Sequence, residues 1–220
     1  MDLHRVAPGF APFGRPSPAL LFLALWVSFS ATAAHGQEWE TRFDEAGVVV
    51  ETRPMAGSRF RAFRGRTQLD ASPEEVLRRL QDIDAYPQWF PDTTEASAVL
   101  RENGRWANYV RTAAPWPVKD RDAVYVSRME RAANKIRIDV FAAPELAPER
   151  DDAVRIRDAS GYWLLEAQGS GTRITWEFHV EPGGNVPSSL ANARVVATPR
   201  GALEALRAYF AKIDEPRGQD

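Results

Sequence analysis

The stretch that decides the fold is PWPVKDRD, residues 115–122, which is followed directly by the alternating segment AVYVSR, residues 123–128. Proline has no backbone N–H and a fixed φ, so a Pro-x-Pro segment does not lie inside a central strand. The stretch therefore predicts a rigid corner at which a strand begins. Because Arg121 lies between Asp120 and Asp122, we expect an ion pair that fixes the direction in which this strand leaves the corner.

Segments with the pattern of β-strands surround this corner. Two lie upstream, from Trp39 to Glu51 and from Ser58 to Leu69. The others cover residues 94–101, 105–113, 122–131, 134–141, 153–158, 161–168 and 172–180. Turn-forming pairs such as Asn103-Gly104 and Ser160-Gly161 separate several of these segments. Connections this short predict an antiparallel meander.

Several of the predicted strands alternate between apolar and polar residues. Ile136, Ile138 and Val140 alternate with charged residues, and residues 173–180 follow the same period of two. Each of these strands therefore has one dry and one wet face, as in an antiparallel sheet that is covered on one side.

The segment that begins at Ser72 has the signals of a helix N-terminus. Ser72 is the expected N-cap, Pro73 suits the first helical position, and Glu75 completes a capping box. We expect this helix to end at Tyr86, because the residue before a proline is pushed out of the α region. The aromatic segment 84–91 that follows is either a hydrophobic plug between helix and sheet or one wall of a ligand-binding space.

Residues 187–213 predict a second helical region. Leu203, Leu206 and Phe210 form an apolar stripe, and Pro199 either kinks the helix or divides it in two. A sheet with one apolar face needs a cover, which this helix can supply. Since its first half carries small residues such as Ala193, we expect an α+β fold in which a curved antiparallel sheet wraps around the helix and encloses an apolar cavity.

The first 36 residues have the layout of a secretory signal peptide. An apolar run from Ala19 to Ala34 follows a weakly basic start, and we expect cleavage between Ala33 and Gln37. The run is shorter than the about 20 residues of a comfortable membrane span, and an uncleaved anchor is the alternative. The expected organisation is a leader (1–36), a folded domain (37–214) and a polar tail (215–220) of an exported protein.

Composition excludes several kinds of chemistry. The formal net charge of −2 gives no indication of nucleic-acid binding. The chain has no cysteine, which excludes disulfides, thiol catalysis and thiolate metal sites. His179 is the only histidine after the leader, too few for a usual zinc site, and the chain has no G-x-S-x-G, Walker or dinucleotide-binding pattern. We therefore expect no metal, no cofactor and no catalytic constellation.

Taken in order, these segments resemble the START (StAR-related lipid-transfer) domains, most closely the exported single-domain bacterial type. The resemblance spans about residues 40–213, and its most specific element is the Pro-x-x-x-Arg-Asp corner formed by Pro117, Arg121 and Asp122. The segments that carry it are SPEEVLRRL (72–80), DIDAYPQWFP (82–91), PWPVKDRDAVYVSR (115–128), AAPELAPE (142–149), AVRIRDASGYWLLE (153–166) and VPSSLANARVVATPRGALEALRAYF (186–210).

The resemblance implies a helix-grip fold that encloses a tunnel for one lipid or other apolar small molecule. It also implies a periplasmic or secreted location and transient contact with membranes. Residues 142–152 predict a surface loop, which from the residues alone is either a tolerated insertion or a lid. The resemblance implies that this loop and the C-terminal helix form a movable lid.

Candidates for the wall of the cavity come from the sheet, the aromatic segment and the C-terminal helix. The apolar candidates are Trp89, Tyr109, Trp116, Tyr125, Ile138, Trp163, Trp176, Phe178, Leu190, Ala193 and Val196. For each aromatic residue alone, plain core packing is the simpler interpretation. Arg111 and Arg121 are candidates for contact with a polar head group, although for Arg121 a structural ion pair is simpler, because an unpaired buried charge costs several kcal/mol.

Two classes of function follow. The first is binding, and transfer, of a single lipid or other hydrophobic molecule without catalysis. The alternative is an enzyme of the polyketide cyclase, aromatase or hydrolase kind, which would use polar groups of the same cavity; its candidate carboxylates are Asp120, Asp122, Asp139 and Glu166. A protein-interaction module that uses the sheet edge is a third hypothesis, for which the chain carries no specific signal.

Overall fold

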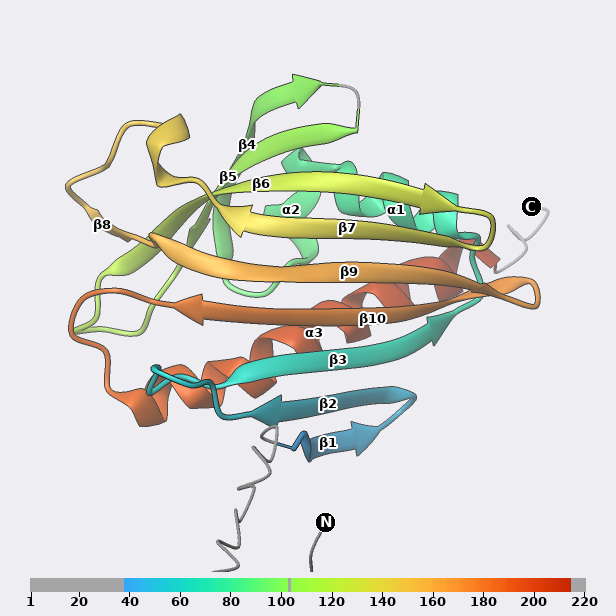
Figure 1. Cartoon of the computed structure of the whole chain (residues 1–220), viewed down its shortest axis with the longest axis horizontal. Coiled ribbons are helices and arrows are strands. Elements are labelled where there is room, and N and C mark those ends of the chain that lie inside the picture. Colours follow the sequence, from blue (N-terminus) through green and yellow to red (C-terminus); the bar gives the residue numbers. More distant parts are fainter. Residues whose placement is uncertain (1–37, 103, 215–220) are drawn as a thin grey trace, which may run out of the picture. The chain divides into compact units, whose positions relative to one another are not determined.

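The computed structural model describes residues 38–102 and 104–214 of the 220-residue chain. The predicted leader (1–36) and tail (215–220) lie outside the described residues. Ten strands form one curved sheet in the order β1-β2-β3-β10-β9-β7-β6-β5-β4, with β8 paired to β6 beside this path (Figure 1). The strands are β1 (Glu40–Glu45), β2 (Val48–Arg53), β3 (Ala62–Leu69), β4 (Thr93–Glu102), β5 (Arg105–Thr112), β6 (Asp120–Ala132), β7 (Lys135–Ala142), β8 (Ala153–Arg155), β9 (Asp158–Gln168) and β10 (Gly171–Glu181).

Helices cover one face of this sheet. They are α1 (Pro73–Gln81), η1 (Ile83–Ala85), α2 (Tyr86–Trp89) and α3 (Ser188–Asp214). The short helix η2 (Pro144–Leu146) lies between Ala143 and Ala147, which pack in a smaller apolar cluster on the opposite face. In Figure 1, α3 lies behind β10 and β3, and α1 and α2 lie farther along the same face. None of the helices within the described residues is both long enough and apolar enough to cross a membrane.

The capping box at Ser72 is confirmed. The backbone N–H of Glu75 donates to Ser72 Oγ at 3.3 Å, and the backbone N–H of Ser72 donates to Glu75 Oε2 at 2.8 Å. The expectation that the helix ends at Tyr86 was wrong, because α1 ends at Gln81. Pro87 instead lies in the first turn of the short helix α2, where its missing N–H costs no hydrogen bond.

The predicted antiparallel meander is correct for every neighbouring pair along the main path of the sheet, but β8 pairs with β6 in parallel. The partner β7 contacts β6 only from Tyr125 onward, so the first residues of β6 have free backbone groups on that side. There β8 forms a parallel pair, with Asp120 opposite Ala153 and Asp122 opposite Arg155.

The predicted turn at Ser160-Gly161 was also wrong, since β9 runs through both residues. Gly161 lies opposite Phe178 of β10 and Val140 of β7. A Cβ atom at Gly161 would lie 2.1 Å from the carbonyl oxygen of Glu177. The glycine is therefore required by close approach of the neighbouring strand and not by a turn.

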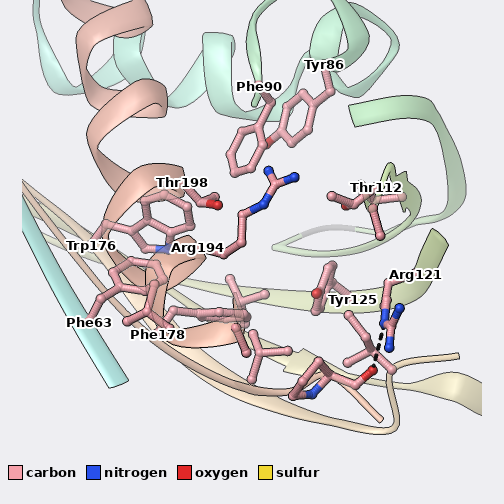
Figure 2. Close-up of a pocket in the computed structure, with 18 of the residues that line it drawn as sticks. Phe63, Tyr86, Phe90, Thr112, Arg121, Tyr125, Trp176, Phe178, Arg194 and Thr198 are labelled. Carbon is pink, nitrogen blue, oxygen red and sulfur yellow. Dashed lines mark hydrogen bonds between the residues drawn. The ribbon is translucent and has the colours of Figure 1, made fainter. Parts of the chain in front are cut away.

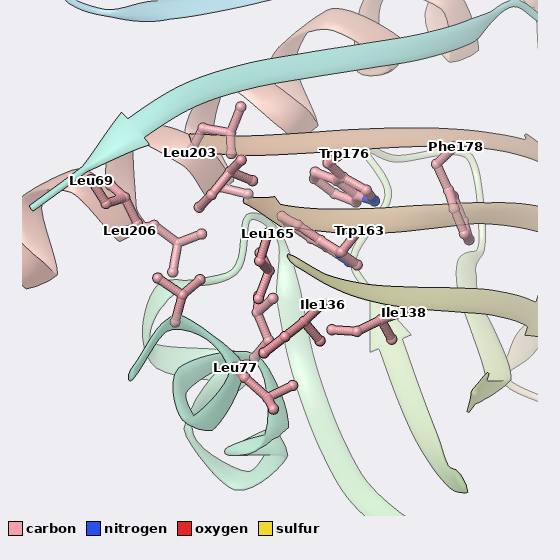
Figure 3. Packing of buried hydrophobic residues seen from close by; sticks show 14 of the residues in the cluster. Leu69, Leu77, Ile136, Ile138, Trp163, Leu165, Trp176, Phe178, Leu203 and Leu206 are labelled. Atoms are coloured by element: carbon pink, nitrogen blue, oxygen red, sulfur yellow. The ribbon is translucent and has the colours of Figure 1, made fainter. Parts of the chain in front are cut away.

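The core lies between the sheet and the C-terminal half of α3. Ala202, Leu203 and Leu206 have no exposed surface, and Figure 3 shows Leu203 and Leu206 beside Leu165 of β9 and Leu69 of β3. The helix approaches the sheet closely at Gly65, where a Cβ atom would lie 2.8 Å from Leu203 Cδ1. Pro199 lies inside α3 and does not divide it, which answers the question that the sequence left open.

Candidate functional site

An apolar cavity of about 310 Å³ lies between the sheet and the first half of α3. Its aromatic wall is built around Trp176, which stacks on Trp163 at a centroid distance of 4.3 Å and meets Phe63 edge-on at 4.7 Å. Figure 2 shows Phe63, Trp176 and Phe178 together on one side, with Tyr86 and Phe90 above them. The alternation of β3, β9 and β10 places these side chains on one face, where mutual aromatic packing stabilises them.

The first half of α3 forms the opposite wall. Its cavity-facing residues are Leu190, Ala191, Arg194, Val195 and Thr198. The spacing of these residues corresponds to one face of a continuous helix. Because Ala202, Leu203 and Leu206 are buried against the sheet in the second half of α3, the rotation of the helix fixes which residues of the first half point to the cavity.

Seven of the thirteen predicted site residues line the cavity. These are Arg121, Tyr125, Ile138, Trp163, Trp176, Phe178 and Leu190. They come from four strands and one helix, so the fold brings together residues that lie as far as about 70 positions apart in the chain. Their contact with a ligand stays a prediction.

Ala193 and Val196 do not line the cavity, because the rotation of α3 turns the neighbouring residues Ala191 and Val195 toward it. Trp89 packs against the edge of the core and meets Tyr86 edge-on at 5.2 Å. The rings that face the cavity from this segment are those of Tyr86 and Phe90.

Tyr109 and Arg111 lie on the other face of the sheet. Asn108, Val110 and Thr112 line the cavity from β5, and successive residues of a strand point to opposite faces. Tyr109 is buried in a second, smaller apolar cluster. The guanidinium of Arg111 binds Asp120 and Asp152.

Trp116 does not lie on the cavity wall either, since 92% of its surface is exposed. It forms the tip of the turn between β5 and β6, where the backbone N–H of Val118 donates to the carbonyl of Pro115 at 3.0 Å. It borders a second hollow beside Leu190 at the start of α3. The expectation that Trp116 forms part of the cavity wall was therefore wrong.

The predicted ion pair between Arg121 and an adjacent aspartate was wrong. Asp120 pairs with Arg111, and Asp122 pairs with Arg155. Arg121 donates to the backbone carbonyls of Lys119, Pro182 and Gly183. Burial lowers the pKa of its guanidinium, and the side chain ties the start of β6 to the connection between β10 and α3.

Sequence reasoning missed several residues of the wall. Phe63 follows the alternation of β3. On β5 an apolar pattern selects Tyr109 over Asn108, although the face that lines the cavity carries Asn108 and Thr112 as well as apolar residues. The missed residues with polar side chains are Arg61, Tyr86, Asn108, Thr112, Ser127, Arg194 and Thr198.

The charged groups at the cavity are all paired with protein groups. Arg61 binds Glu40 at 3.0 Å, and Arg194 of α3 binds Asp92 in the connection before β4. Among the described residues that line the cavity there is no Asp, Glu, His or Lys. No group of three or more potential metal-binding side chains occurs in the described part of the chain. The site is therefore an apolar enclosure with a few neutral hydrogen-bonding groups.

A curved antiparallel sheet that holds a long C-terminal helix around an apolar cavity defines the helix-grip class. Residues 61–211 match the family model described as "Polyketide cyclase / dehydrase and lipid transport". The chain belongs to this family of START-like proteins.

The similar proteins agree with that assignment. An uncharacterized protein of Pseudomonas aeruginosa is 32% identical over 86% of this chain and 95% of its own length. Mouse phosphatidylcholine transfer protein is 23% identical over 73% of this chain and 78% of its own length. The solved STAR-related lipid transfer protein of Xanthomonas axonopodis is 38% identical, with a TM-score of 0.74, over 79% of this chain and 98% of that structure.

Proposed function

We propose that this protein binds a single hydrophobic small molecule in its internal cavity and acts as a carrier and not as an enzyme. The observation that carries the proposal is the enclosed wall of aromatic and aliphatic side chains between the sheet and α3. Burial of an apolar ligand in such a space is favoured by the hydrophobic effect. Relatives named as lipid transfer proteins support the same ligand class.

The lining supports a carrier over an enzyme. General acid–base catalysis needs titratable groups that converge on one point, and the described wall contains no carboxylate and no histidine. The candidate carboxylates of the alternative lie elsewhere: Asp120 and Asp122 are held by Arg111 and Arg155, and Asp139 is paired with Arg137. None of these carboxylates reaches the cavity wall, and neither does Glu166 of β9.

Organic extraction of the purified protein followed by mass spectrometry tests this proposal. We expect a co-purified hydrophobic molecule in about equimolar amount, and saturable uptake of Nile red, an uncharged apolar dye, by protein freed of ligand. An empty extract together with no uptake of Nile red would contradict the proposal.

We further propose transient contact with membranes through the tip of the corner. Trp116 is exposed beside two prolines, and it borders the same hollow as Leu190 of α3. Transfer of one large apolar side chain from water contributes about 1.5–3 kcal/mol, so Trp116→Ala should weaken binding to phosphatidylcholine vesicles about 10-fold or more. Vesicle co-sedimentation measures this effect.

The control for that variant is Phe141→Ala, which removes an exposed aromatic residue, 47% exposed, from β7. It should leave vesicle binding unchanged. Equal losses in both variants would indicate nonspecific adsorption and contradict a docking role for Trp116.

We also propose export. The leader pattern of residues 1–36 supports it, and the family resemblance to exported bacterial members favours the periplasm. The mass of the chain recovered outside the cytoplasm should correspond to cleavage between Ala33 and Gln37. Recovery of only the uncleaved chain in the membrane fraction would favour an anchor.

A further inference from the structure

Three neutral polar side chains form one patch on the cavity wall, which we call the β5–β6 patch: Asn108, Tyr125 and Ser127. Asn108 lies directly opposite Tyr125 in the pairing of β5 with β6, so both side chains project from neighbouring positions on the same face. Ser127 is the next residue of β6 on that face. The patch therefore belongs to the rigid centre of the sheet and not to a loop.

No contact within the described part of the fold explains why residue 108 is polar. Its side chain is only 6% exposed, and Oδ1 has no hydrogen-bond partner within residues 38–102 and 104–214. A buried acceptor without a partner costs free energy of folding, which an apolar residue of similar size would avoid. Because Asn108 lines the cavity, a turn of its amide would give this acceptor a partner on a molecule that occupies the cavity.

Tyr125 supplies a second neutral group beside Asn108. Figure 2 shows its side chain at the cavity between Arg194 and Arg121. Burial raises the pKa of this phenol, so the hydroxyl stays protonated at physiological pH and can both donate and accept a hydrogen bond. The two side chains together therefore offer an amide and a hydroxyl.

The charged residues at the wall do not form a free anion site. Arg194 is paired with Asp92, Arg61 is paired with Glu40, and Arg121 is bound to backbone carbonyls. The wall, as far as the structure describes it, contains no carboxylate that would bind a cation. Neutral hydrogen bonding is thus the polar chemistry that remains available, and of the described wall residues only Asn108, in the β5–β6 patch, has a buried polar atom without a partner.

We propose that the β5–β6 patch recognises a hydroxyl group of the ligand, and that the ligand is an uncharged hydrophobic alcohol. This inference rests on the proposed function of the cavity. A hydroxyl can accept from Tyr125 and from Asn108 Nδ2, and once the amide turns Oδ1 toward the cavity it can donate to Oδ1. A carboxylate or ketone can only accept and leaves Asn108 Oδ1 without a partner, whereas a hydrocarbon leaves the whole amide unpaired.

The size of the cavity narrows the ligand further. A volume of about 310 Å³ is at the lower end of the range for sites that enclose one small molecule. It favours an alcohol with a single chain or a compact ring system over a lipid with two long chains.

Competition with bound Nile red tests the proposal, with decan-1-ol, decane and decanoate as competitors. For the wild-type protein we expect decan-1-ol to bind about 10-fold or more tightly than decane or decanoate. Asn108→Leu should weaken binding of decan-1-ol about 10- to 100-fold, leave decane within about 2-fold, and leave the Tm of the unliganded protein unchanged or raised.

Two further variants keep the test decisive. Thr175→Val removes a neutral polar group from the face of β10 that points away from the cavity, and it should leave the preference for decan-1-ol unchanged. Ser127→Ala tests the same patch with a smaller change if Asn108→Leu does not fold, and it should reduce the preference for decan-1-ol by several-fold.

The outcomes separate this inference from the proposed function. Binding of Nile red with equal competition by decan-1-ol and decane would overturn the hydroxyl site and leave the apolar carrier intact. Strongest competition by decanoate would also overturn it, because recognition would then depend on an arginine. Failure to bind Nile red or any competitor would overturn the carrier and the hydroxyl site together.

Discussion

Replacing Asp122 by asparagine should lower the free energy of unfolding by about 3–5 kcal/mol. The carboxylate of Asp122 has no exposed surface, and it accepts from Arg155 Nε at 3.0 Å and from Nη2 at 2.9 Å. The variant keeps the size of the side chain but leaves the guanidinium of Arg155, which is only 2% exposed, without a counter-charge.

The large effect arises because Arg155 organises more than one partner. It also donates to the carbonyls of Pro144, Ala147 and Pro148, so it holds the loop between β7 and β8 against the start of β6. This loop is the segment that the family resemblance implied as part of a movable lid. Because the buried Arg155 is bonded to four partners, we expect this loop to stay in place while a ligand enters or leaves. The first half of α3 is then the part of the cavity wall that we expect to move.

Urea denaturation measures the change, and a loss of this size lowers Tm by about 6–20 °C for a domain of this length. Glu149→Gln is the matched control, because it breaks the exposed pair with Arg157 in the same loop and should cost no more than about 1 kcal/mol. The double variant Asp122→Leu/Arg155→Met should lie between Asp122→Asn and the wild type, since it removes both charges but leaves the loop carbonyls unpaired. A change below about 1 kcal/mol for Asp122→Asn would contradict this account.

The second large effect is expected on binding. Ala191→Trp should abolish uptake of Nile red, with at least a 10-fold loss of affinity, because the indole would occupy the space between α3 and the aromatic wall. Since the new side chain enters space that is already open, Tm should change by only a few degrees. Fluorescence titration with Nile red and a thermal scan of the same sample measure both quantities.

Ala193→Trp is the control for that prediction. Ala193 is two residues away on the same helix but is exposed, so the substitution carries the same loss of helix propensity without entering the cavity. It should bind Nile red as the wild type does. Loss of binding in both variants, or in neither, would place the ligand somewhere other than beside Ala191.

The sequence predicted the local structure well where the signal lies within a few residues. The capping box at Ser72, the paired strands on either side of Asn103-Gly104, and the apolar face of Ile136 and Ile138 are all confirmed. The prediction was wrong where the same local pattern has more than one structural explanation. At Ser160-Gly161 the glycine indicated a turn, but it is required by close contact with the neighbouring strand.

The candidate site was predicted in part for a related reason. The apolar wall residues Trp163, Trp176 and Phe178 follow the period of two and lie where the pattern places them. On β5 the same period selected Tyr109, because that strand has an apolar cluster on the face away from the cavity and presents Asn108 to the ligand space. Periodicity identifies residues that share a face but does not say which face encloses the cavity.

By itself, the sequence determined the class of fold, the corner at residues 115–122 and the apolar character of the enclosed space, since each depends on backbone geometry and on hydrophobic periodicity. Only the tertiary structure decided the partners of the charges at that corner. Asp122 pairs with Arg155, 33 positions away, while Arg121 binds the connection to α3. Three-dimensional packing makes that choice, because an ion pair between distant residues depends on which strands become neighbours and not on the order of residues along the chain.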